Sequence, residues 1–156
     1  MVKEKETRFT VSTTGVGRKD YSLDVEFSVE PIVRSYQSSY VYDEVYALTG
    51  GQTRTIDIPV STGYVRLLYD FLLSCPANVL LGFIVQSVEA DGTVNNIFEK
   101  VGYQRIEHRH DRGAPIFNMI RVTITNYSDL DLTSVALNLT GISMTTDQYY
   151  LEVSAS

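Results

Sequence analysis

The residues best suited to chemistry are the two histidines of the chain, His108 and His110. Successive side chains of a strand point to opposite faces, so residues two apart share a face and the two imidazoles would lie together. Imidazoles bind zinc or copper when a third ligand completes the site. Glu107 and Asp111 flank the pair, but no second cluster in the sequence supplies that ligand. We therefore expect no metal and no cofactor, and keep His108 and His110 as weak metal candidates beside the simpler interpretation of a polar strand face or loop.

The other reactive side chains have ordinary structural interpretations. Cys75 is the only cysteine, which excludes an intrachain disulfide, and it precedes a proline in an apolar segment. We interpret it as a small buried residue. Asp129 and Asp131 offer oxygen ligands of the kind that calcium binds, but their turn lacks the EF-hand pattern, which favours solvated turn acids. The sequence has no GxSxG nucleophile motif, and we expect the protein not to be an enzyme.

Tyrosine is enriched in the chain, which has 11 tyrosines and no tryptophan. Tyrosine rings bury a large area at low entropic cost, which suits subunit interfaces. The clustered tyrosines have two interpretations: they cover the faces of sheets, or they form a subunit interface or a carbohydrate-stacking platform. As interface candidates we name Tyr36, Tyr40, Tyr42, Tyr46, Tyr149 and Tyr150.

Strands must position these side chains, and the clearest strand pattern covers residues 116–144. Apolar and polar residues alternate over 116–125, which buries one face of a strand and exposes the other. A polar turn follows, and the alternation resumes over 135–144. The phase of this second strand changes after Gly141, where we predict a β-bulge.

The rest of the chain also has mainly strand patterns. Residues 64–73 and 79–88 are apolar on both faces, which is typical of central strands or of strands with one face against a neighbouring subunit. Residues 40–48 fit both helical and strand spacing, and their β-branched and aromatic side chains favour a strand. The other segments are expected strands at 8–14, 23–29, 53–60 and 147–153, a short strand or helical turn at 97–101, a polar mixed segment at 102–110 and a loop at 111–115.

Length and composition indicate a single folded domain. A chain of 156 residues, of which 44% are hydrophobic, is large enough to form one core. We expect an all-β fold, an antiparallel β-sandwich of jelly-roll type with about eight to ten strands. The expected organisation is a charged arm at 1–7, the sandwich at 8–153 and a short tail at 154–156.

The charge pattern argues against two classes of partner. The formal net charge is −6, whereas nucleic-acid binding depends largely on lysines and arginines that contact phosphates. We therefore expect no nucleic-acid partner. The N-terminal residues MVKEKETR do not resemble a signal peptide, and no apolar stretch is long enough to span a membrane, so we expect no membrane partner.

Two stretches carry a resemblance to known proteins. LTGGQTRTIDIP at 48–59 is a glycine-rich turn followed by a strand, and VTITNYS at 122–128 is a strand that ends in a turn. They resemble phrases in the small β-sandwich proteins of bacteriophage virions, namely capsid decoration (cement) proteins and head–tail accessory proteins. The resemblance implies a non-enzymatic virion protein, made in the host cytoplasm, that forms homo-oligomers, often trimers in such families. It would dock on the major capsid protein or another virion protein.

Two other functions stay open. The first is a carbohydrate- or receptor-binding β-sandwich module of a phage tail, which would need exposed aromatic residues along a groove. The second is a small enzyme with a cupin-like barrel, which would place His108 and His110 inside the barrel with a metal.

Overall fold

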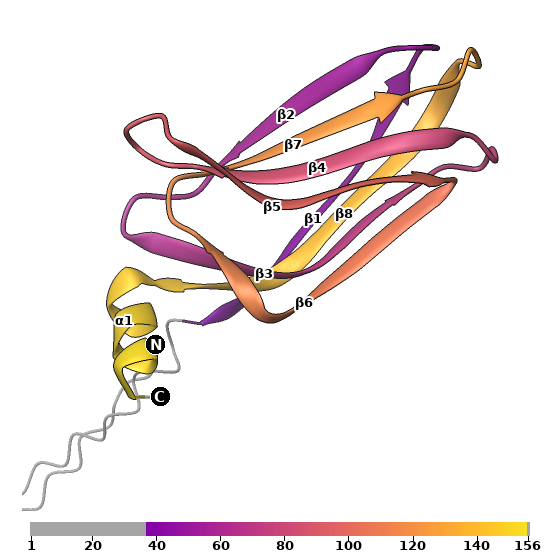
Figure 1. Cartoon of the computed structure of the whole chain (residues 1–156). Helices are drawn as coiled ribbons and strands as arrows, with labels where there is room; N and C mark the ends of the chain where they lie inside the picture. The colour runs from indigo at the N-terminus through magenta and orange to yellow at the C-terminus, as the bar shows by residue number, and fades with distance from the viewer. Residues whose placement is uncertain (1–36, 156) are drawn as a thin grey trace, which may run out of the picture. The chain divides into compact units, whose positions relative to one another are not determined.

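The computed structural model describes residues 37–155, which form eight β-strands and one α-helix (Figure 1). The elements are β1 (Ser38–Leu48), β2 (Thr53–Pro59), β3 (Tyr64–Ser74), β4 (Leu80–Val88), β5 (Val94–Tyr103), β6 (Arg105–Ile116), β7 (Met119–Asn126), β8 (Leu132–Thr145) and α1 (Thr146–Ala155). The expected arm 1–7, the expected strands 8–14 and 23–29, and Tyr36 lie outside the described residues. In the described part of the chain, no helix has the length and apolar character needed to cross a membrane.

The strands form two four-stranded sheets that lie face to face (Figure 1). One sheet has the order β1-β8-β3-β6 and the other the order β2-β7-β4-β5, and all neighbouring strands are antiparallel. Apart from the β4–β5 hairpin, each strand is followed in the chain by a strand of the other sheet. This connectivity is that of a jelly roll. The predicted all-β, antiparallel sandwich of jelly-roll type is therefore confirmed.

The core lies between the sheets and consists of the alternating apolar residues. Ile120, Val122 and Ile124 of β7 and Leu137 and Leu139 of β8 are completely buried, as the alternation predicted. Removal of such side chains from water stabilises the fold by roughly 25 cal/mol per Å² of apolar surface. β3 and β4, which are apolar on both faces, each have a neighbouring strand on both sides, so the expectation of central strands is confirmed.

The two segments that fitted either a strand or a helix are strands, and the prediction of one loop is wrong. Residues 40–48 lie in β1 and residues 97–101 in β5. The expected loop at 111–115 belongs to β6, at the edge of its sheet, where residues 110–113 stand opposite Tyr69 of β3. Gly113 has φ +80°, which a residue with a β-carbon rarely adopts, so a glycine lets the strand continue through this irregular stretch.

The β-bulge expected at Gly141 lies in the neighbouring strand instead. The pairing of β8 with β1 continues through Gly141, whereas the pairing of β8 with β3 shifts at Tyr69. A β-carbon on Gly141 would lie 2.0 Å from the carbonyl oxygen of Leu67. Glycine is therefore needed at this position because the bulged β3 backbone approaches β8 closely. The change of phase itself is confirmed, since Leu139 faces the core between the sheets and Met144 belongs to a separate cluster.

The expected last strand, 147–153, is wrong, because these residues form α1. The Gln148 amide donates a hydrogen bond to Thr145 Oγ1 at 3.1 Å, which caps the N-terminus of the helix. Asp147 in the first turn is favourable beside the positive end of the helix dipole. Thr145 and Gln148 match the capping-box spacing Ser/Thr-x-x-Glu/Gln, a signal that outweighs the tyrosine-rich strand pattern. The helix extends to Ala155.

Candidate functional site

A polar groove crosses the outer face of the β1-β8-β3-β6 sheet. Thr140 of β8, Asp70 of β3 and Arg109 of β6 are register partners, so their side chains form one row across the sheet. The next row in the same direction consists of Asn138, Leu72 and Glu107. The groove lined by these rows has a volume of about 580 Å³. Its size is in the range of small-ligand sites.

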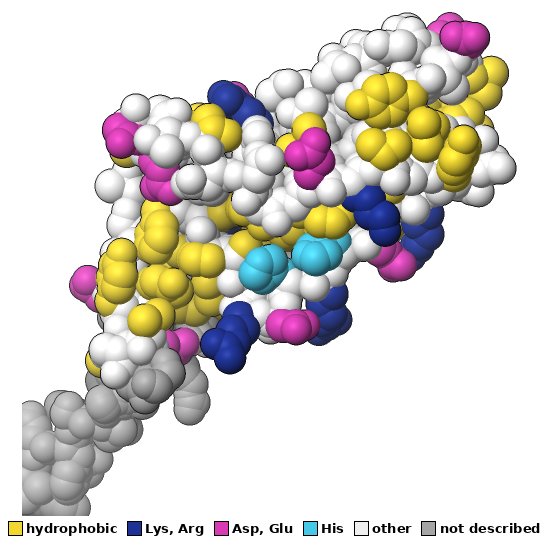
Figure 2. All heavy atoms as spheres, in the orientation of Figure 1, with side chains coloured by type: hydrophobic (Ala, Val, Ile, Leu, Met, Phe, Trp, Pro, Cys, Tyr) yellow, Lys and Arg dark blue, Asp and Glu magenta, His cyan; other side chains and the backbone are white. Residues whose placement is uncertain are grey.

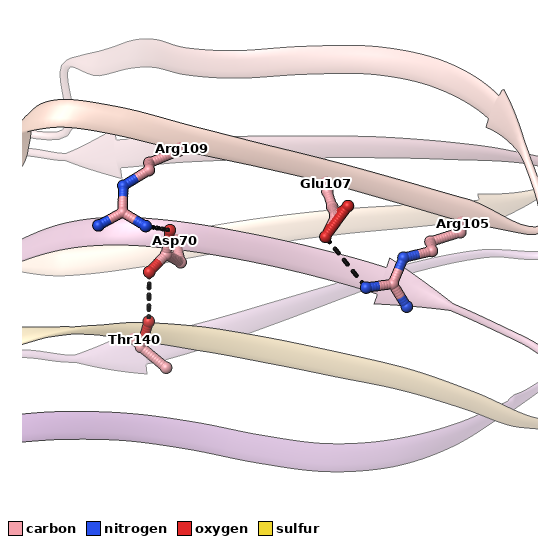
Figure 3. Close-up of polar contacts among 5 residues, drawn as sticks. All are labelled: Asp70, Arg105, Glu107, Arg109 and Thr140. Carbon is pink, nitrogen blue, oxygen red and sulfur yellow. Dashed lines mark hydrogen bonds and ion pairs between the residues drawn. The ribbon is translucent and has the colours of Figure 1, made fainter.

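Asp70 is at the centre of the polar contacts in the groove (Figure 3). Its Oδ2 accepts a hydrogen bond from Thr140 Oγ1 at 3.3 Å, and its Oδ1 lies 3.4 Å from Arg109 Nη1. Arg105 and Glu107 form a second ion pair on β6 at 3.0 Å. Because these ion pairs are largely exposed, they add little stability and can exchange partners with a ligand. The chemistry that this groove offers is hydrogen bonding to a polar ligand.

The two histidines lie at the open side of the sandwich, between the edge strands β5 and β6 (Figure 2). The His108 ring stacks on the Phe98 ring of β5, with 4.5 Å between the centroids, and lies 5.6 Å from the Phe71 ring. The His110 ring is 6.0 Å from that of His108, so the two imidazoles lie together as their spacing predicted. His108 therefore packs against the aromatic edge of the core and links one sheet to the other.

The described residues do not complete a metal site around this pair. In residues 37–155, no three His, Cys, Asp or Glu side chains are arranged to hold a metal ion. The Nδ1 atom of His110 is buried and has no hydrogen-bond partner in the described part of the chain. Besides His110, the rings around His108 are those of Phe71 and Phe98, which offer no ligand atoms. The pair is therefore better described as part of the aromatic packing between β5 and β6.

Three of the predicted interface tyrosines, Tyr40, Tyr42 and Tyr46, are half-buried against the core from β1. The hydroxyl groups of Tyr42 and Tyr46 hydrogen-bond to each other, and the Arg54 guanidinium lies 4.8 Å from the Tyr46 ring centroid. Burial, with that hydrogen bond, raises the pKa of Tyr46. Burial also raises the pKa of Tyr40, although the guanidinium of Arg66, 4.0 Å from its ring, opposes this rise. These rings thus pack the side of the sandwich between β1 and β2.

The two predicted tyrosines of α1 differ in exposure. Tyr149 packs on a small apolar cluster that includes Val65 and Met144, on the outer face of the first sheet. The Phe117 ring lies 5.5 Å from that of Tyr149 and 6.1 Å from that of Tyr150. Tyr150 is 58% exposed. Among the predicted tyrosines in residues 37–155, only Tyr150 is largely at the surface, and the role of all of them at an interface stays a prediction.

The buried amide of Asn126 holds two loops together at one end of the sandwich. Its Nδ2 group donates to the carbonyl oxygens of Leu48 and Thr49 in the β1–β2 turn and of Leu130 in the β7–β8 loop. Its Oδ1 accepts hydrogen bonds from the amide and hydroxyl of Ser128. The polar turn predicted after residue 125 is therefore confirmed, and Asn126 determines its conformation.

The other side chains considered for chemistry also make structural contacts. Asp131 Oδ1 accepts a hydrogen bond from the Gly50 amide at 2.9 Å, which ties the β7–β8 loop to the β1–β2 turn. Cys75 is buried, and its Sγ donates to the carbonyl oxygen of Ala77 at 3.1 Å. The interpretation of Cys75 as a small buried residue is confirmed.

Two tyrosines that the sequence did not single out are highly exposed, Tyr103 at 64% and Tyr127 at 56%. Tyr103 of β5 is the register partner of Leu80 of β4, and the Tyr127 amide donates to the Leu80 carbonyl oxygen at 3.0 Å. The three side chains therefore form one row on the outer face of the β2-β7-β4-β5 sheet. Figure 2 shows hydrophobic side chains gathered over the right-hand ends of β4 and β5. Tyr103 is the last residue of β5, and Tyr127 follows β7. Their exposure depends on the order of the strands in the sheet, which the sequence alone does not show.

The strand order and the surfaces described above define a jelly-roll domain. No family model and no curated protein matches the sequence. Among solved structures, the chain is similar to that of infectious bursal disease virus Gx strain, with a TM-score of 0.38 and 14% identity over 87% of this chain and 37% of that chain. It is also similar to the VP2 subviral particle of infectious bursal disease virus, with a TM-score of 0.41 and 12% identity over 90% of this chain and 38% of that chain.

The chain spans less than two fifths of the length of these matched chains, at 37% and 38%. At such low TM-scores and identities the similarity carries no argument about function. The assignment of the fold rests on the strand order in the two sheets.

Proposed function

We propose that this chain is a non-enzymatic structural protein of a virion, more narrowly a bacteriophage capsid decoration or head–tail accessory protein. In this role it associates with copies of itself and docks on a protein shell. The observation that carries the proposal is how the jelly roll uses the side chains that were considered for chemistry. His108 stacks on Phe98, Cys75 bonds to Ala77, and Asp131 holds the β1–β2 turn.

The fold and the sequence support the proposal from two further directions. Jelly rolls serve as viral capsid domains, as lectin domains and as cupins, so the fold is compatible with a shell protein without requiring it. The two stretches that resemble phage virion proteins lie in β2 and its preceding turn and in β7 and its following loop. These two strands are neighbours in one sheet, so the resemblance falls on one continuous part of the fold.

The experiment is to look for the full-length chain on virus particles and to measure its native mass. Antibodies raised against the purified chain should label particles from its source in negative-stain electron microscopy. Native mass spectrometry and sedimentation velocity should show oligomers whose population rises with concentration. A chain that stays monomeric at every concentration and labels no particle would overturn the proposal.

One observation favours a second candidate, a carbohydrate- or receptor-binding module. The groove on the outer face of the first sheet presents a carboxylate, an amide and a hydroxyl, from Asp70, Asn138 and Thr140, beside the apolar side chain of Leu72. Saccharides are bound by such combinations of hydrogen-bonding groups and apolar surface. This candidate predicts binding on a glycan array that the Asn138→Ala substitution abolishes. The Thr53→Ala substitution, on the other sheet, is the matched control and should leave binding unchanged.

A further inference from the structure

The outer face of the β2-β7-β4-β5 sheet carries two exposed tyrosines in one row. Tyr103 and Tyr127 lie on either side of Leu80, and Val101, 50% exposed, lies in the next row of the sheet. We call the outer face of this sheet around these four residues the tyrosine face. Tyrosine is enriched in the cores of protein interfaces because its ring buries much area while its hydroxyl finds a partner.

The ring of Tyr127 is held in place before any partner binds. Its side chain lies against the backbone of Gly82, where a β-carbon would come within 2.7 Å of the ring. The buried Asn126 immediately before it is anchored by hydrogen bonds from its amide to three carbonyl oxygens. A side chain that is ordered in advance loses little conformational entropy when it is covered, so it favours binding.

The rows beside the tyrosines are almost free of charge. One row runs from Val101 through Gly82 to Thr125 and Thr53, as the register of the three pairs of strands requires. The following row consists of Glu99, Ile84, Thr123 and Thr55. Glu99 is the only charged residue of these rows, and it lies on the edge strand β5. The row beyond them on the same face contains the ion pair of Asp57 and Arg121, so the tyrosine face is the uncharged end of this sheet.

The outer face of the other sheet has the opposite character. Three adjacent rows on that face contain five charged residues, namely Asp43, Asp70, Arg105, Glu107 and Arg109. Charged residues are depleted from the cores of protein interfaces, because their desolvation is costly unless each charge finds a partner. Of the two outer faces of the sandwich, the tyrosine face is therefore the one suited to be covered by protein.

The chemistry of the tyrosine face favours a second copy of this chain as the occupant. An isologous contact requires a surface that complements itself. Threonine hydroxyls both donate and accept hydrogen bonds, so Thr53, Thr55, Thr123 and Thr125 can meet the same side chains of another copy. Two copies that each carry a net charge of −6 repel each other wherever charged surfaces meet. The tyrosine face, where Glu99 is the one charged residue of the rows beside the tyrosines, is where the copies can approach.

The area of the tyrosine face fits a contact that is weak by itself. Four strands at about 4.8 Å spacing and about six residues at about 3.3 Å rise give a face of roughly 19 by 20 Å. Two such faces bury roughly 800 Å² in plan, and more when protruding rings are counted, which is less than the roughly 1,200 Å² of the smallest standard interfaces. Such a contact becomes stable when many copies are held together, as in a shell.

We propose that the tyrosine face is the surface through which two copies of this chain associate, sheet against sheet, with Tyr103 and Tyr127 at its centre. This inference rests on the proposed structural role and names the contact that the role requires. It also explains why β4 is apolar on both faces, since Leu80 and Ile84 are only half-buried in a single copy.

The test compares two aspartate substitutions in matched surroundings. Val101→Asp places a charge on the tyrosine face, and Val41→Asp places one on the outer face of the other sheet. Both valines are on edge strands, at 50% and 61% exposure respectively. Sedimentation velocity of the full-length chain should show that Val101→Asp weakens self-association by about tenfold or more, since the charge would be buried without a partner. Val41→Asp should associate like the wild type.

The outcomes separate this inference from the proposed function. If the wild type associates and Val101→Asp associates equally well, or Val41→Asp weakens association as much, the assignment of the surface is overturned while self-association stands. If the wild type never associates, this inference is overturned, and the labelling of virus particles decides separately whether the proposed function stands. Tyr103→Ser, which removes an exposed ring without adding a charge, provides a second variant should Val101→Asp fail to fold, as judged by circular dichroism. It should weaken association in the same direction.

Discussion

Asn126 is the residue on which the loops at one end of the sandwich depend. Its side-chain amide is fully buried and donates to the carbonyl oxygens of Leu48, Thr49 and Leu130. When a buried carbonyl oxygen loses its donor, the folded state is destabilised. In the unfolded state that oxygen bonds to water, whereas in the fold it finds no partner. Tyr127 of the tyrosine face is the next residue along the chain, so these hydrogen bonds also anchor its backbone.

We expect the Asn126→Ala substitution to lower the free energy of unfolding by about 3 kcal/mol, because it leaves buried carbonyl groups without donors. Urea denaturation followed by circular dichroism measures this change. The control is Asn138→Ala on the outer face of the first sheet, where the side chain is partly exposed. We expect that substitution to change the free energy of unfolding by about 0.5 kcal/mol or less. Equal effects of the two substitutions would show that the Asn126 hydrogen bonds do not stabilise the loops.

Asp57 and Arg121 provide a prediction about acid stability. Two hydrogen bonds from Arg121, at 2.8 and 3.1 Å, hold the pKa of the Asp57 carboxyl below its usual value. A carboxyl group whose pKa is lower in the folded state adds stability above its unfolded pKa of about 4. This stability is lost as the pH falls through the folded pKa.

The Asp57→Asn substitution should therefore lower Tm slightly at about pH 7, with a smaller difference from the wild type at about pH 2. The effect is small because the Asp57 side chain is exposed and that of Arg121 partly exposed, and added salt should reduce it further. Thermal unfolding at the two pH values measures it. The explanation would be wrong if the difference in Tm stayed the same at about pH 2.

At the scale of the elements, β3 and β8 depend on a close approach of their backbones. A β-carbon on Gly141 of β8 would lie 2.0 Å from the Leu67 carbonyl oxygen of β3. The Gly141→Ala substitution must push the two strands apart, and we expect it to lower the free energy of unfolding by about 3 kcal/mol. Gly102→Ala is the control, because the nearest atom to its β-carbon would be a side-chain carbon of Ile106 at 3.2 Å. If Gly102→Ala destabilised the protein more in urea denaturation, the strands would not need glycine at 141.

The elements also show how far local patterns can be followed. The alternation in residues 120–124 predicted β7 and its buried face, because the two-residue period of a strand is a local property. The helix at 146–155 was missed although Thr145 and Gln148 carry a capping signal, because the tyrosines favour strands about as strongly. β6 was missed because its irregular stretch depends on Tyr69 of another strand.

The whole molecule provides a prediction about the association of its copies. The net charge of −6 opposes association, whereas the tyrosine face offers few charges for an ion pair with a second copy. An increase in salt from about 0.1 to about 1 M shortens the Debye length from about 10 to about 3 Å and screens the repulsion between copies. Self-association measured by sedimentation velocity should therefore strengthen with salt. A contact held by ion pairs would weaken instead.

The candidate surfaces were only partly predictable at this scale. The shared face of His108 and His110 followed from their spacing, but their position against Phe98 required two edge strands from different sheets to meet. The sequence indicated tyrosines as interface residues without indicating which of them would be exposed. Tyr40 and Tyr42 are half-buried, whereas Tyr103 and Tyr127 are at the surface.

The sequence by itself determined that the protein is an all-β sandwich and which side of most strands is buried, because alternation depends only on neighbouring residues. The tertiary structure alone decided the strand order, the position of the bulge beside Gly141, and the gathering of uncharged residues at one end of the outer face of the β2-β7-β4-β5 sheet. These features arise where strands distant in the chain become neighbours in a sheet. No local pattern contains the information about which strands pair.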